Sequence, residues 1–390
     1  MIKFAHIADV HLGAFRDLTL REMNLNAFLK AMDKCIEEDV DFIIVAGDLF
    51  DNHMPDAKIL SKAVKKMREV KDRGIEIYVI YGSHDYSPIQ ASIIDVLHSA
   101  GLFVKLTKNF IEDKKTRAKI AGVSALKRGE IEEDISQISF LDNNSFKIFV
   151  LHAAIEEVFP DPRLEPISLK RFKGEVNYLA CGHVHQRAIN KIGNTLVAYS
   201  GSLFGYSYQD LENTARGEDR GFFIVSVDDS KIDYKFIEIK EAEVSILEYD
   251  VTGKNPNSVM EEIKDILSDV KDKVILIKVF GRLRSGKPYD IDFSLIKENF
   301  LERGAKVIYI NRNQLLGKEE EEIEIIEETR EETEKRLFEE YLKKFNFKNK
   351  RLQDVKTSLN LLNALREENK GETKADYEKR IKEIGLKILS

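Results

Sequence analysis

The chain has 390 residues, of which 43% are hydrophobic, so it can bury a sizeable core and is not a disordered protein. Its only two cysteines, Cys35 and Cys181, exclude a disulfide scaffold and favour the reducing cytoplasm. No stretch approaches the roughly 18 apolar residues of a membrane helix, and the first residues lack the layout of a signal peptide.

The net charge of −7 is concentrated in one segment. Residues 318–334 hold ten acidic and two basic residues, a net charge of −8, so the remainder of the chain carries +1. A bulk charge does not describe a local groove. The net acidity therefore does not exclude nucleic acid as a partner.

The N-terminal part is predicted to be α/β. Short apolar strands at 2–8, 41–46 and 75–81 alternate with amphipathic helices. Thr19 and Glu22 have the spacing of a capping box that opens the first helix. The second helix has one apolar face and ends at Gly74. Ser87 followed by Pro88 is expected to open the third.

From about residue 103 the pattern becomes strand-rich. Extended segments are expected at 119–123, 147–151, 178–180, 195–200, 221–227 and 232–239. These strands predict two sheets packed together with helices outside. Residues 1–240 are therefore expected to form the first domain.

A smaller α/β domain is expected over residues 241–316. Its strands are predicted at 244–251, 274–280 and 306–310, and its helices at 257–270 and 292–303. The acidic segment that follows, 317–334, has too few apolar residues to fold by itself and is interpreted as a linker.

Residues 335–390 are predicted to be helical. Their apolar residues share helical faces, as Val355, Leu359 and Leu362 do. These faces either pack among themselves or form a docking module for a partner, and periodicity does not decide between the two.

Six of the eight histidines lie at or just after the end of an apolar strand, beside acids or glycines: His11, His53, His84, His152, His183 and His185. Ligands gather at the carboxyl ends of the strands of open α/β sheets. Imidazole and carboxylate suit manganese, iron or zinc. Two ions about 3.5–4 Å apart could hold a phosphate and generate hydroxide for in-line attack. His6 and His98 are interpreted as structural, and His53 as either a substrate contact or loop surface.

The ordered series Asp9-x-His11, Gly47-Asp48, Gly82-x-His84-Asp85, His152 and Gly182-His183-x-His185 resembles the calcineurin-like metallophosphoesterases. Within them the chain is most similar to the Mre-eleven/SbcD-type nucleases of DNA double-strand-break repair. Residues 4–13 and 198–202 also read like that subgroup. The specific motifs lie within 1–240, whereas the small domain and the tail match in arrangement only.

The resemblance implies a four-layer fold, in which a two-sheet sandwich is flanked by helices, with a capping domain and a helical tail. It implies a hydrolase that binds two Mn2+ per chain, with 3′-5′ exonuclease and single-strand endonuclease activity in double-strand-break repair. The implied partners are DNA, a second copy of the chain in a homodimer, and a coiled-coil ABC-type ATPase of the Rad-fifty/SbcC type. The dimer would use 57–70 and 89–100, and the tail from about Leu337 would bind the ATPase.

The family's ligand roles carry over by position. One ion would be held by Asp9, His11, Asp48 and His185, and the other by Asp48, Ser83, His152 and His183. His84 would stand above the phosphate as general acid or charge stabiliser. Asp85 would orient His84, or it is a surface acid at a helix start.

Two positions depart from the family pattern. Most relatives have Asn where this chain has Ser83, and a hydroxyl is a shorter, weaker ligand. Ser83 could bind directly, bind through water, or leave the second ion loosely held. Some of these nucleases carry a His at the position of Asp51, and His53 lies two residues further on.

Contacts to DNA are expected from cations in predicted loops, among them Arg16, Arg187, Arg220, Arg282 and Arg284, and from His53. Ordinary solvated charge is the alternative for each of them. Tyr206 could stack on a base or simply pack. Two other functions are open: hydrolysis of a small phosphodiester or nucleotide, and a lapsed site retained as a scaffold for the ATPase.

Overall fold

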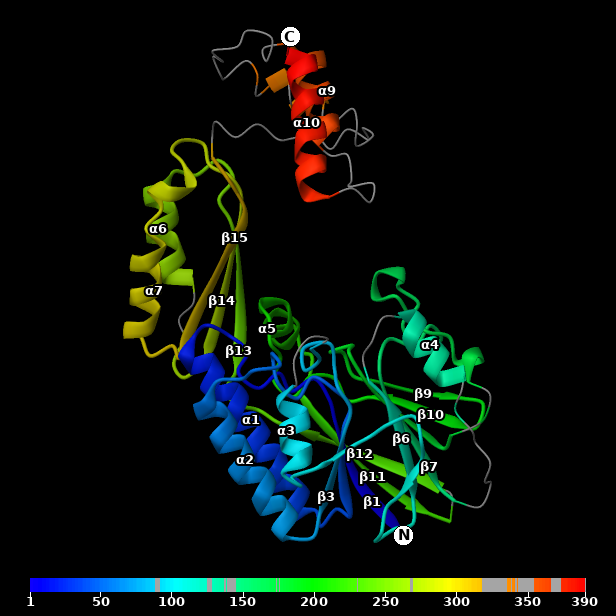
Figure 1. The fold of residues 1–390 in the computed structure, drawn as a ribbon. Coiled ribbons are helices and arrows are strands. Elements are labelled where there is room, and N and C mark those ends of the chain that lie inside the picture. Colours follow the sequence, from blue (N-terminus) through cyan, green and yellow to red (C-terminus); the bar gives the residue numbers. More distant parts are fainter. Residues whose placement is uncertain are drawn as a thin grey trace. The chain divides into compact units, whose positions relative to one another are not determined.

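The computed structural model describes residues 1–87, 92–124, 128–136, 138, 145–172, 174, 176–229, 231–266, 269–317, 335–337, 339–340, 342, 354–365 and 373–389. The chain divides into two compact units, Met1–Glu319 and Glu320–Ser390 (Figure 1). The first unit holds three sheets, and the second holds two described helices.

The first sheet has the strand order β12-β11-β1-β2-β3-β4. Its strands are β1 (Ile2–Ile7), β2 (Phe42–Val45), β3 (Glu76–Val79), β4 (Val104–Lys105), β11 (Gly221–Asp228) and β12 (Lys231–Glu238). Strands β1 to β4 are parallel, and β11 pairs antiparallel to β1. The helices α1 (Leu18–Glu37), α2 (Ala57–Asp72) and α3 (Ile93–Ser99) cover its outer face (Figure 1).

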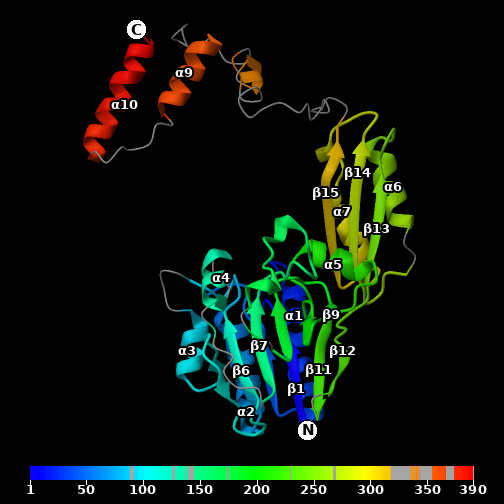
Figure 2. The same ribbon diagram turned by 90° about the vertical axis from the view of Figure 1, so that its right-hand side faces the viewer.

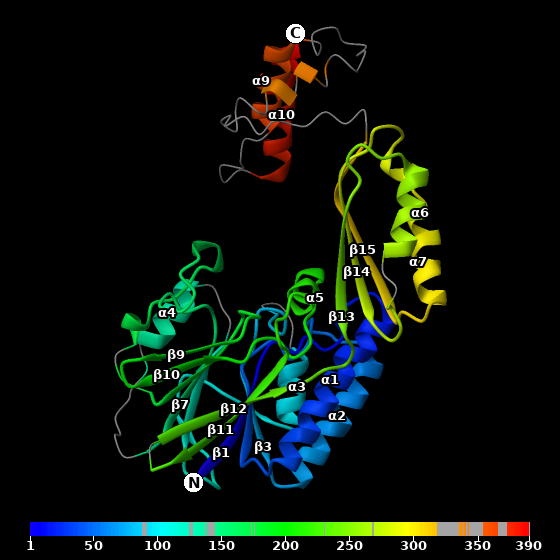
Figure 3. The same cartoon turned by 180° about the vertical axis from the view of Figure 1, so that it is seen from behind.

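The second sheet has the order β5-β6-β7-β8-β10-β9. Its strands are β5 (Ile111–Glu112), β6 (Lys119–Val123), β7 (Lys147–His152), β8 (Tyr178–Gly182), β9 (Ala188–Ile192) and β10 (Thr195–Tyr199). Phe4 and Phe42 of the first sheet pack against Tyr178 and Ile148 of the second, which makes the buried layer between them. Helix α4 (Arg128–Ser136) packs on the outer face of this sheet (Figure 3).

The third sheet is formed by β13 (Val244–Asp250), β14 (Val274–Arg282) and β15 (Val307–Leu316), which are all parallel. The helices α6 (Pro256–Ile266) and α7 (Phe293–Glu302) cover one face (Figure 2). The other face packs at one end against α5 (Tyr208–Ala215). The predicted fold class, an α/β two-sheet sandwich flanked by helices with a small α/β domain, is confirmed.

Several element boundaries differ from those expected, and three of them are informative. Helix α1 begins one residue after Asp17, whose carboxylate accepts from the amides of Thr19 and Leu20, so the cap is not Thr19. Strand β15 continues to Leu316 because its polar second half still pairs with β14. Helix α3 begins after Ser92, and the start expected after Ser87 falls on residues 88–91, outside the described ones.

In the second unit, α9 (Val355–Leu365) packs against α10 (Lys374–Leu389). The predicted apolar face of α10, with Tyr377, Ile381, Ile384 and Ile388, is half-buried. The acidic segment from 318 to 334, and with it Phe338, Tyr341 and Phe345, lies outside the described residues. Among the residues described, no helix combines the length and apolar character needed to cross a membrane.

Candidate metal centre

The predicted ligands follow five strands whose carboxyl ends meet at one edge of the two sheets. Asp9 and His11 follow β1, Asp48 follows β2, and Ser83 and His84 follow β3. His152 is the last residue of β7, and His183 and His185 follow β8. Neighbouring parallel strands in each sheet place these turns side by side. Segments far apart in the chain therefore converge on one cluster of side chains, which we call the centre.

Four of these residues have left-handed backbone conformations. The φ angles are +50° for Asp9, +48° for His11, +49° for Asp48 and +83° for His183. Such conformations are uncommon outside glycine and concentrate at functional sites, where the surrounding structure maintains them. All four stand just after strand ends. Among the described residues, the side chains of Asp9, His11 and Asp48 belong to candidate metal-binding groups, whereas that of His183 does not.

The ligand atoms lie close together. Nε2 of His152 is 3.1 Å from Oδ2 of Asp48, and Nε2 of His11 is 3.6 Å from the same oxygen. Nε2 of His11 also lies 3.3 Å from Nε2 of His185. The residues form three groups, and within each group the ligand atoms lie within 4.8 Å of one another. The groups are Asp9 with His11 and His185, Asp9 with Asp48 and His152, and His11 with Asp48 and His84. Asp9 and Asp48 each belong to two groups.

The chemistry of these atoms fits divalent cations. Among the described residues, Oδ2 of Asp9 and Nε2 of His152 are buried and make no hydrogen bond of good geometry, although Nε2 of His152 lies 3.1 Å from Oδ2 of Asp48. Buried polar groups are normally satisfied, so orphaned acceptors that converge on one point indicate a missing positive partner. Carboxylate and imidazole are ligands for manganese, iron or zinc.

Outer contacts fix how two of the histidine rings face the centre. Nδ1 of His152 donates to the carbonyl oxygen of Ala46 at 2.8 Å, and Nδ1 of His185 donates to Oδ1 of Asp210 at 3.0 Å. Both bonds leave Nε2 facing the other ligands. The backbone amide of His183 donates to Oδ1 of Asp9 at 2.9 Å. The ring of His183 lies edge-on to that of His152, with 5.3 Å between centroids.

The electrostatics of the centre are set by its carboxylates. Burial would raise the pKa of Asp48, but the charges of His152 and His11 and the hydrogen bonds it accepts outweigh burial and hold this pKa below its usual range. Burial would lower the pKa of His152, but Asp48 and Asp9 outweigh burial and raise it to about 9. The pocket therefore has a negative potential that favours cations.

His84 stands beside the ligands and is held by Asp51. Its Nδ1 donates to the carbonyl oxygen of Asp51 at 3.0 Å, and its backbone amide donates to Oδ1 of Asp48 at 2.8 Å. The carboxylate of Asp51, with Oδ1 3.5 Å from the same Nδ1, raises the pKa of His84 to about 9 against the opposing effect of burial. The hydroxyl of Ser83 donates to Oδ2 of Asp48 at 3.4 Å, so Ser83 also lies at the centre.

Asp85 differs from both of its predicted roles. Its carboxylate is fully buried and accepts from the backbone amides of Leu49, Phe50 and Gly82 at 3.0, 2.8 and 3.2 Å. It therefore ties the turn after β2 to the turn after β3. It does not orient the His84 ring, which Asp51 holds, and it is not a surface acid.

The residues expected to contact DNA are scattered. Arg16 and Arg284 are exposed, and His53 and Arg282 are half-buried. Arg187 pairs with Asp219 at 3.1 Å and stacks on a phenylalanine ring. Arg220 lies in a loop, as expected, but it is 4% exposed and bonded within the fold, so it does not present its charge to DNA.

Tyr206 stacks on the ring of His11, with 4.4 Å between centroids and an angle of 18° between the ring planes.

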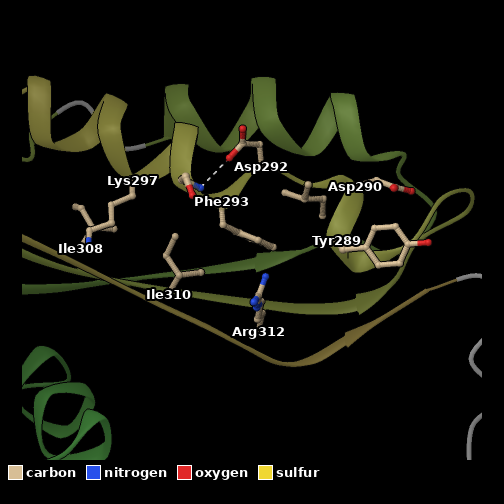
Figure 4. A pocket seen from close by; sticks show the side chains of 10 residues that line it. Tyr289, Asp290, Asp292, Phe293, Lys297, Ile308, Ile310 and Arg312 are labelled. Atoms are coloured by element: carbon tan, nitrogen blue, oxygen red, sulfur yellow. Dashed lines mark hydrogen bonds between the residues drawn. The ribbon is translucent and has the colours of Figure 1, made fainter. Parts of the chain in front are cut away.

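A groove between α7 and β15 (Figure 4) is lined by Asp290, Asp292, Lys297 and Arg312. Its mixed charges differ from those of a phosphate-tracking surface.

Sequence reasoning missed Asp210 and gave no role to Asp51. Asp210 is separated from His185 by 25 positions and stands in the first turn of α5. Its only local signal is the spacing Ser207-x-x-Asp210, which is a helix-start pattern and says nothing of a histidine.

Comparison with known proteins defines the class. Residues 2–187 match the family model described as calcineurin-like phosphoesterase, so this part of the chain is a calcineurin-like metallophosphoesterase domain. Enzymes of this family use a dinuclear metal site, and the described residues contain candidate ligand groups for one.

The chain is 28% identical over 320 residues to "DNA double-strand break repair protein Mre11" of Methanocaldococcus jannaschii, covering 78% of this chain and 82% of that protein. It is 27% identical over 302 residues to the protein of the same name from Methanococcus maripaludis, covering 72% and 79%. A dimetal phosphatase from Danio rerio superposes with a TM-score of 0.40 at 11% identity over 61% of this chain and 96% of that one.

Proposed function

We propose that this chain is a manganese-dependent DNA nuclease of double-strand-break repair, with 3′-5′ exonuclease and single-strand endonuclease activity. The observation that carries the proposal is the convergence of Asp9, His11, Asp48, His152 and His185 on one pocket with orphaned acceptor atoms. The similarity to archaeal break-repair proteins supports DNA as the substrate, because it extends over 78% of the chain, well beyond the phosphoesterase domain.

The residues divide the chemistry among themselves. Asp9, His11, Asp48 and His185 would hold one ion, and Asp48, Ser83, His152 and His183 the other, with Asp48 between them. When bound, two such ions would activate water and neutralise the charge of the phosphate. His84, held by Asp51, would donate a proton to the departing sugar oxygen or stabilise its charge. Asp85 keeps the turns of Asp48 and His84 together.

The domains and partners belong to the same proposal. Residues 1–240 would form the nuclease domain, 241–316 a capping domain that contacts DNA, 317–334 a linker, and 335–390 the segment that binds a coiled-coil ABC-type ATPase. A homodimer would form through α2 and α3. Val96 on α3 is 53% exposed, which supports a surface that a second copy could cover. The protein would act on DNA in the cytoplasm.

The direct test measures hydrolysis of duplex, hairpin and single-stranded DNA by the purified full chain with and without Mn2+, beside a small phosphodiester. Metal-loaded protein that cleaves the small ester but not DNA would reassign the substrate. Metal-loaded protein that cleaves neither would support a lapsed site.

His84→Ala tests the division of roles. Hydrolysis should fall about 100-fold or more while the Mn2+ content stays near wild type. His98→Ala is the matched control. His98 lies on α3 and donates to the carbonyl oxygen of Phe103, so its loss should change neither hydrolysis nor Mn2+ content. Loss of metal together with activity in His84→Ala would make His84 a ligand.

A further inference from the structure

The candidate ligand histidines differ in the hydrogen-bond partner of Nδ1, the ring nitrogen that faces away from the centre. Nδ1 of His152 donates to a backbone carbonyl. Nδ1 of His11 makes no hydrogen bond within the described part of the chain, and a carboxylate oxygen of Asp51 lies 3.6 Å away. Only His185, of these three, donates to a side-chain carboxylate, that of Asp210. The orientation of His185 therefore depends on a residue of α5.

Asp210 is itself held in place on its other oxygen. Its Oδ2 accepts from the backbone amides of Tyr206 and Ser207 at 3.0 and 3.2 Å, and from the hydroxyl of Ser207 at 3.0 Å. The residue is 5% exposed. Gly205, at a φ of +103°, makes room for it, because a Cβ there would lie 2.6 Å from the Cβ of Asp210. One oxygen is committed to the loop, and the other is left for His185.

Arg220 connects the backbone of His185 to the backbone of Asp210. Its Nη1 donates to the carbonyl oxygen of His185 at 2.9 Å, and its Nη2 donates to that of Asp210 at 2.8 Å. The hydroxyls of Ser202 and Thr214 accept further bonds at 2.8 Å each, and Oε2 of Glu218 accepts one at 3.4 Å. A rigid guanidinium with several bonds fixes the distance between two segments better than a flexible cation would.

On the side away from His185, α5 and the residue that ends it contact strands of the third sheet. Arg216 pairs with Glu248 of β13 at 2.6 Å, and the ring of Tyr208 lies 5.0 Å from that of Tyr309 on β15. The helix that carries Asp210 is thus packed between the metal centre and the third sheet (Figure 3). It has little freedom to carry Asp210 away from His185.

We propose that Asp210, fixed by Arg220, is the positioning residue of His185 and sets the affinity of the centre for one of its two ions. A carboxylate that accepts from Nδ1 keeps Nε2 unprotonated and aimed at the ion, and raises its basicity. The inference rests on the two-ion centre of the proposed function, but not on DNA as the substrate. The alternative is that Asp210 only caps α5 through its capping box with Ser207.

The experiment titrates the metal-free full chain with Mn2+ and follows bound ions by calorimetry and by the loss of the free-ion electron paramagnetic resonance signal. Wild type should bind two ions. Asp210→Asn, nearly the same size, should weaken one of them by about 10-fold to 100-fold and leave the other near its wild-type affinity. Asp219→Asn is the matched control, since this exposed carboxylate pairs with Arg187 on the surface.

A second pair of variants separates positioning from folding. Arg220→Gln should weaken the same ion as Asp210→Asn, whereas Arg117→Gln, which loses only an exposed pair with Glu112, should bind both ions as wild type does. Thermal unfolding in chelator reports the structural cost of each. If Arg220→Gln does not fold, the Mn2+ titration of Asp210→Asn alone decides whether Asp210 positions His185.

The outcomes distinguish this inference from the proposed function. Wild type that binds fewer than two ions removes the two-ion centre and the nuclease with it. Wild type that binds two ions, together with Asp210→Asn that binds both equally well, overturns the positioning role. Equal weakening of both ions in Asp210→Asn also overturns it, because a capping defect would disturb the whole pocket.

Discussion

Gly82 lies directly against Asp48: a Cβ built on Gly82 would stand 2.0 Å from Oδ1 and 2.2 Å from the backbone nitrogen of Asp48. Both contacts are far shorter than any van der Waals approach, and one of them is to backbone. The turn after β3 therefore requires glycine so that Asp48 can reach the centre. We predict that Gly82→Ala displaces Asp48, lowers the unfolding free energy by about 1–3 kcal/mol and weakens Mn2+ binding.

Urea unfolding in chelator and Mn2+ titration measure the two effects. Gly129→Ala is the control, because Gly129 is exposed in α4 and its Cβ would meet nothing within 4 Å. That substitution should raise the unfolding free energy by about 0.5–1 kcal/mol and leave metal binding unchanged. Wild-type metal affinity in Gly82→Ala would contradict the placement of Asp48.

Metal binding should stabilise the fold measurably. An ion that binds only the folded chain adds about 2.7 kcal/mol per site to the unfolding free energy at a free concentration of 100 times its Kd. Asp48→Asn should remove most of this gain, because Asp48 belongs to two of the candidate ligand groups. Asp33→Asn, which loses only a half-exposed pair with Lys66, should retain it. Denaturant unfolding with Mn2+ and with chelator gives the difference, and an equal gain in both variants would exclude Asp48 as a ligand.

The fold was predictable where local pattern and burial agree. Continuous apolar runs such as 42–45 and 148–151 correctly predicted strands because both of their faces are buried. The polar half of β15 was missed, since Asn311 to Gln314 show no period-two pattern and are strand only because β14 pairs with them. The start of α1 was misplaced because Asp17 and Thr19 are both good caps and the sequence does not rank them.

At the metal centre, the candidate ligands at strand ends could be predicted from the sequence. The residues that hydrogen-bond to these ligands and orient them could not. An Asp-x-His after a strand has a local signature. The contact between His185 and Asp210 depends on how α5 packs, which no local pattern encodes. For the same reason the three backbone amides that bind Asp85 were not foreseen, and its carboxylate was expected either to orient His84 or to lie on the surface at a helix start.

His6 makes the fold sensitive to acid independently of the metal centre. It is fully buried, and its Nδ1 is hydrogen-bonded to the hydroxyl of Tyr178 at 2.9 Å. Burial lowers the pKa of His6 to about 3 from an ordinary 6.5, so between these values the unfolded chain binds more protons at this residue. The unfolding free energy should fall as the pH falls from about 6.5 to 3, by up to about 1.4 kcal/mol per unit from this residue.

The comparison of wild type with His6→Gln isolates this contribution, because other titrating groups are common to both. Unfolding by urea in chelator at pH 7.5, 6 and 5 should show a shallower loss of stability in the variant, although it starts lower at pH 7.5. Parallel curves for the two proteins would show that His6 is protonated equally easily in both states.

Tyr206 separates two explanations of an aromatic residue at the centre. Because one face of its ring covers His11, and the ring also lies edge-on to His84 and His185, we expect packing to be its main role. Tyr206→Phe should then behave as wild type, and Tyr206→Ala should lose Mn2+ affinity by a few-fold, since His11 is left without a neighbour on that side. If the ring instead stacks on a base, Tyr206→Ala should bind Mn2+ normally and raise the KM for single-stranded DNA, with a loss of about 1–3 kcal/mol in binding. Metal titration and steady-state cleavage of the same three proteins decide between them.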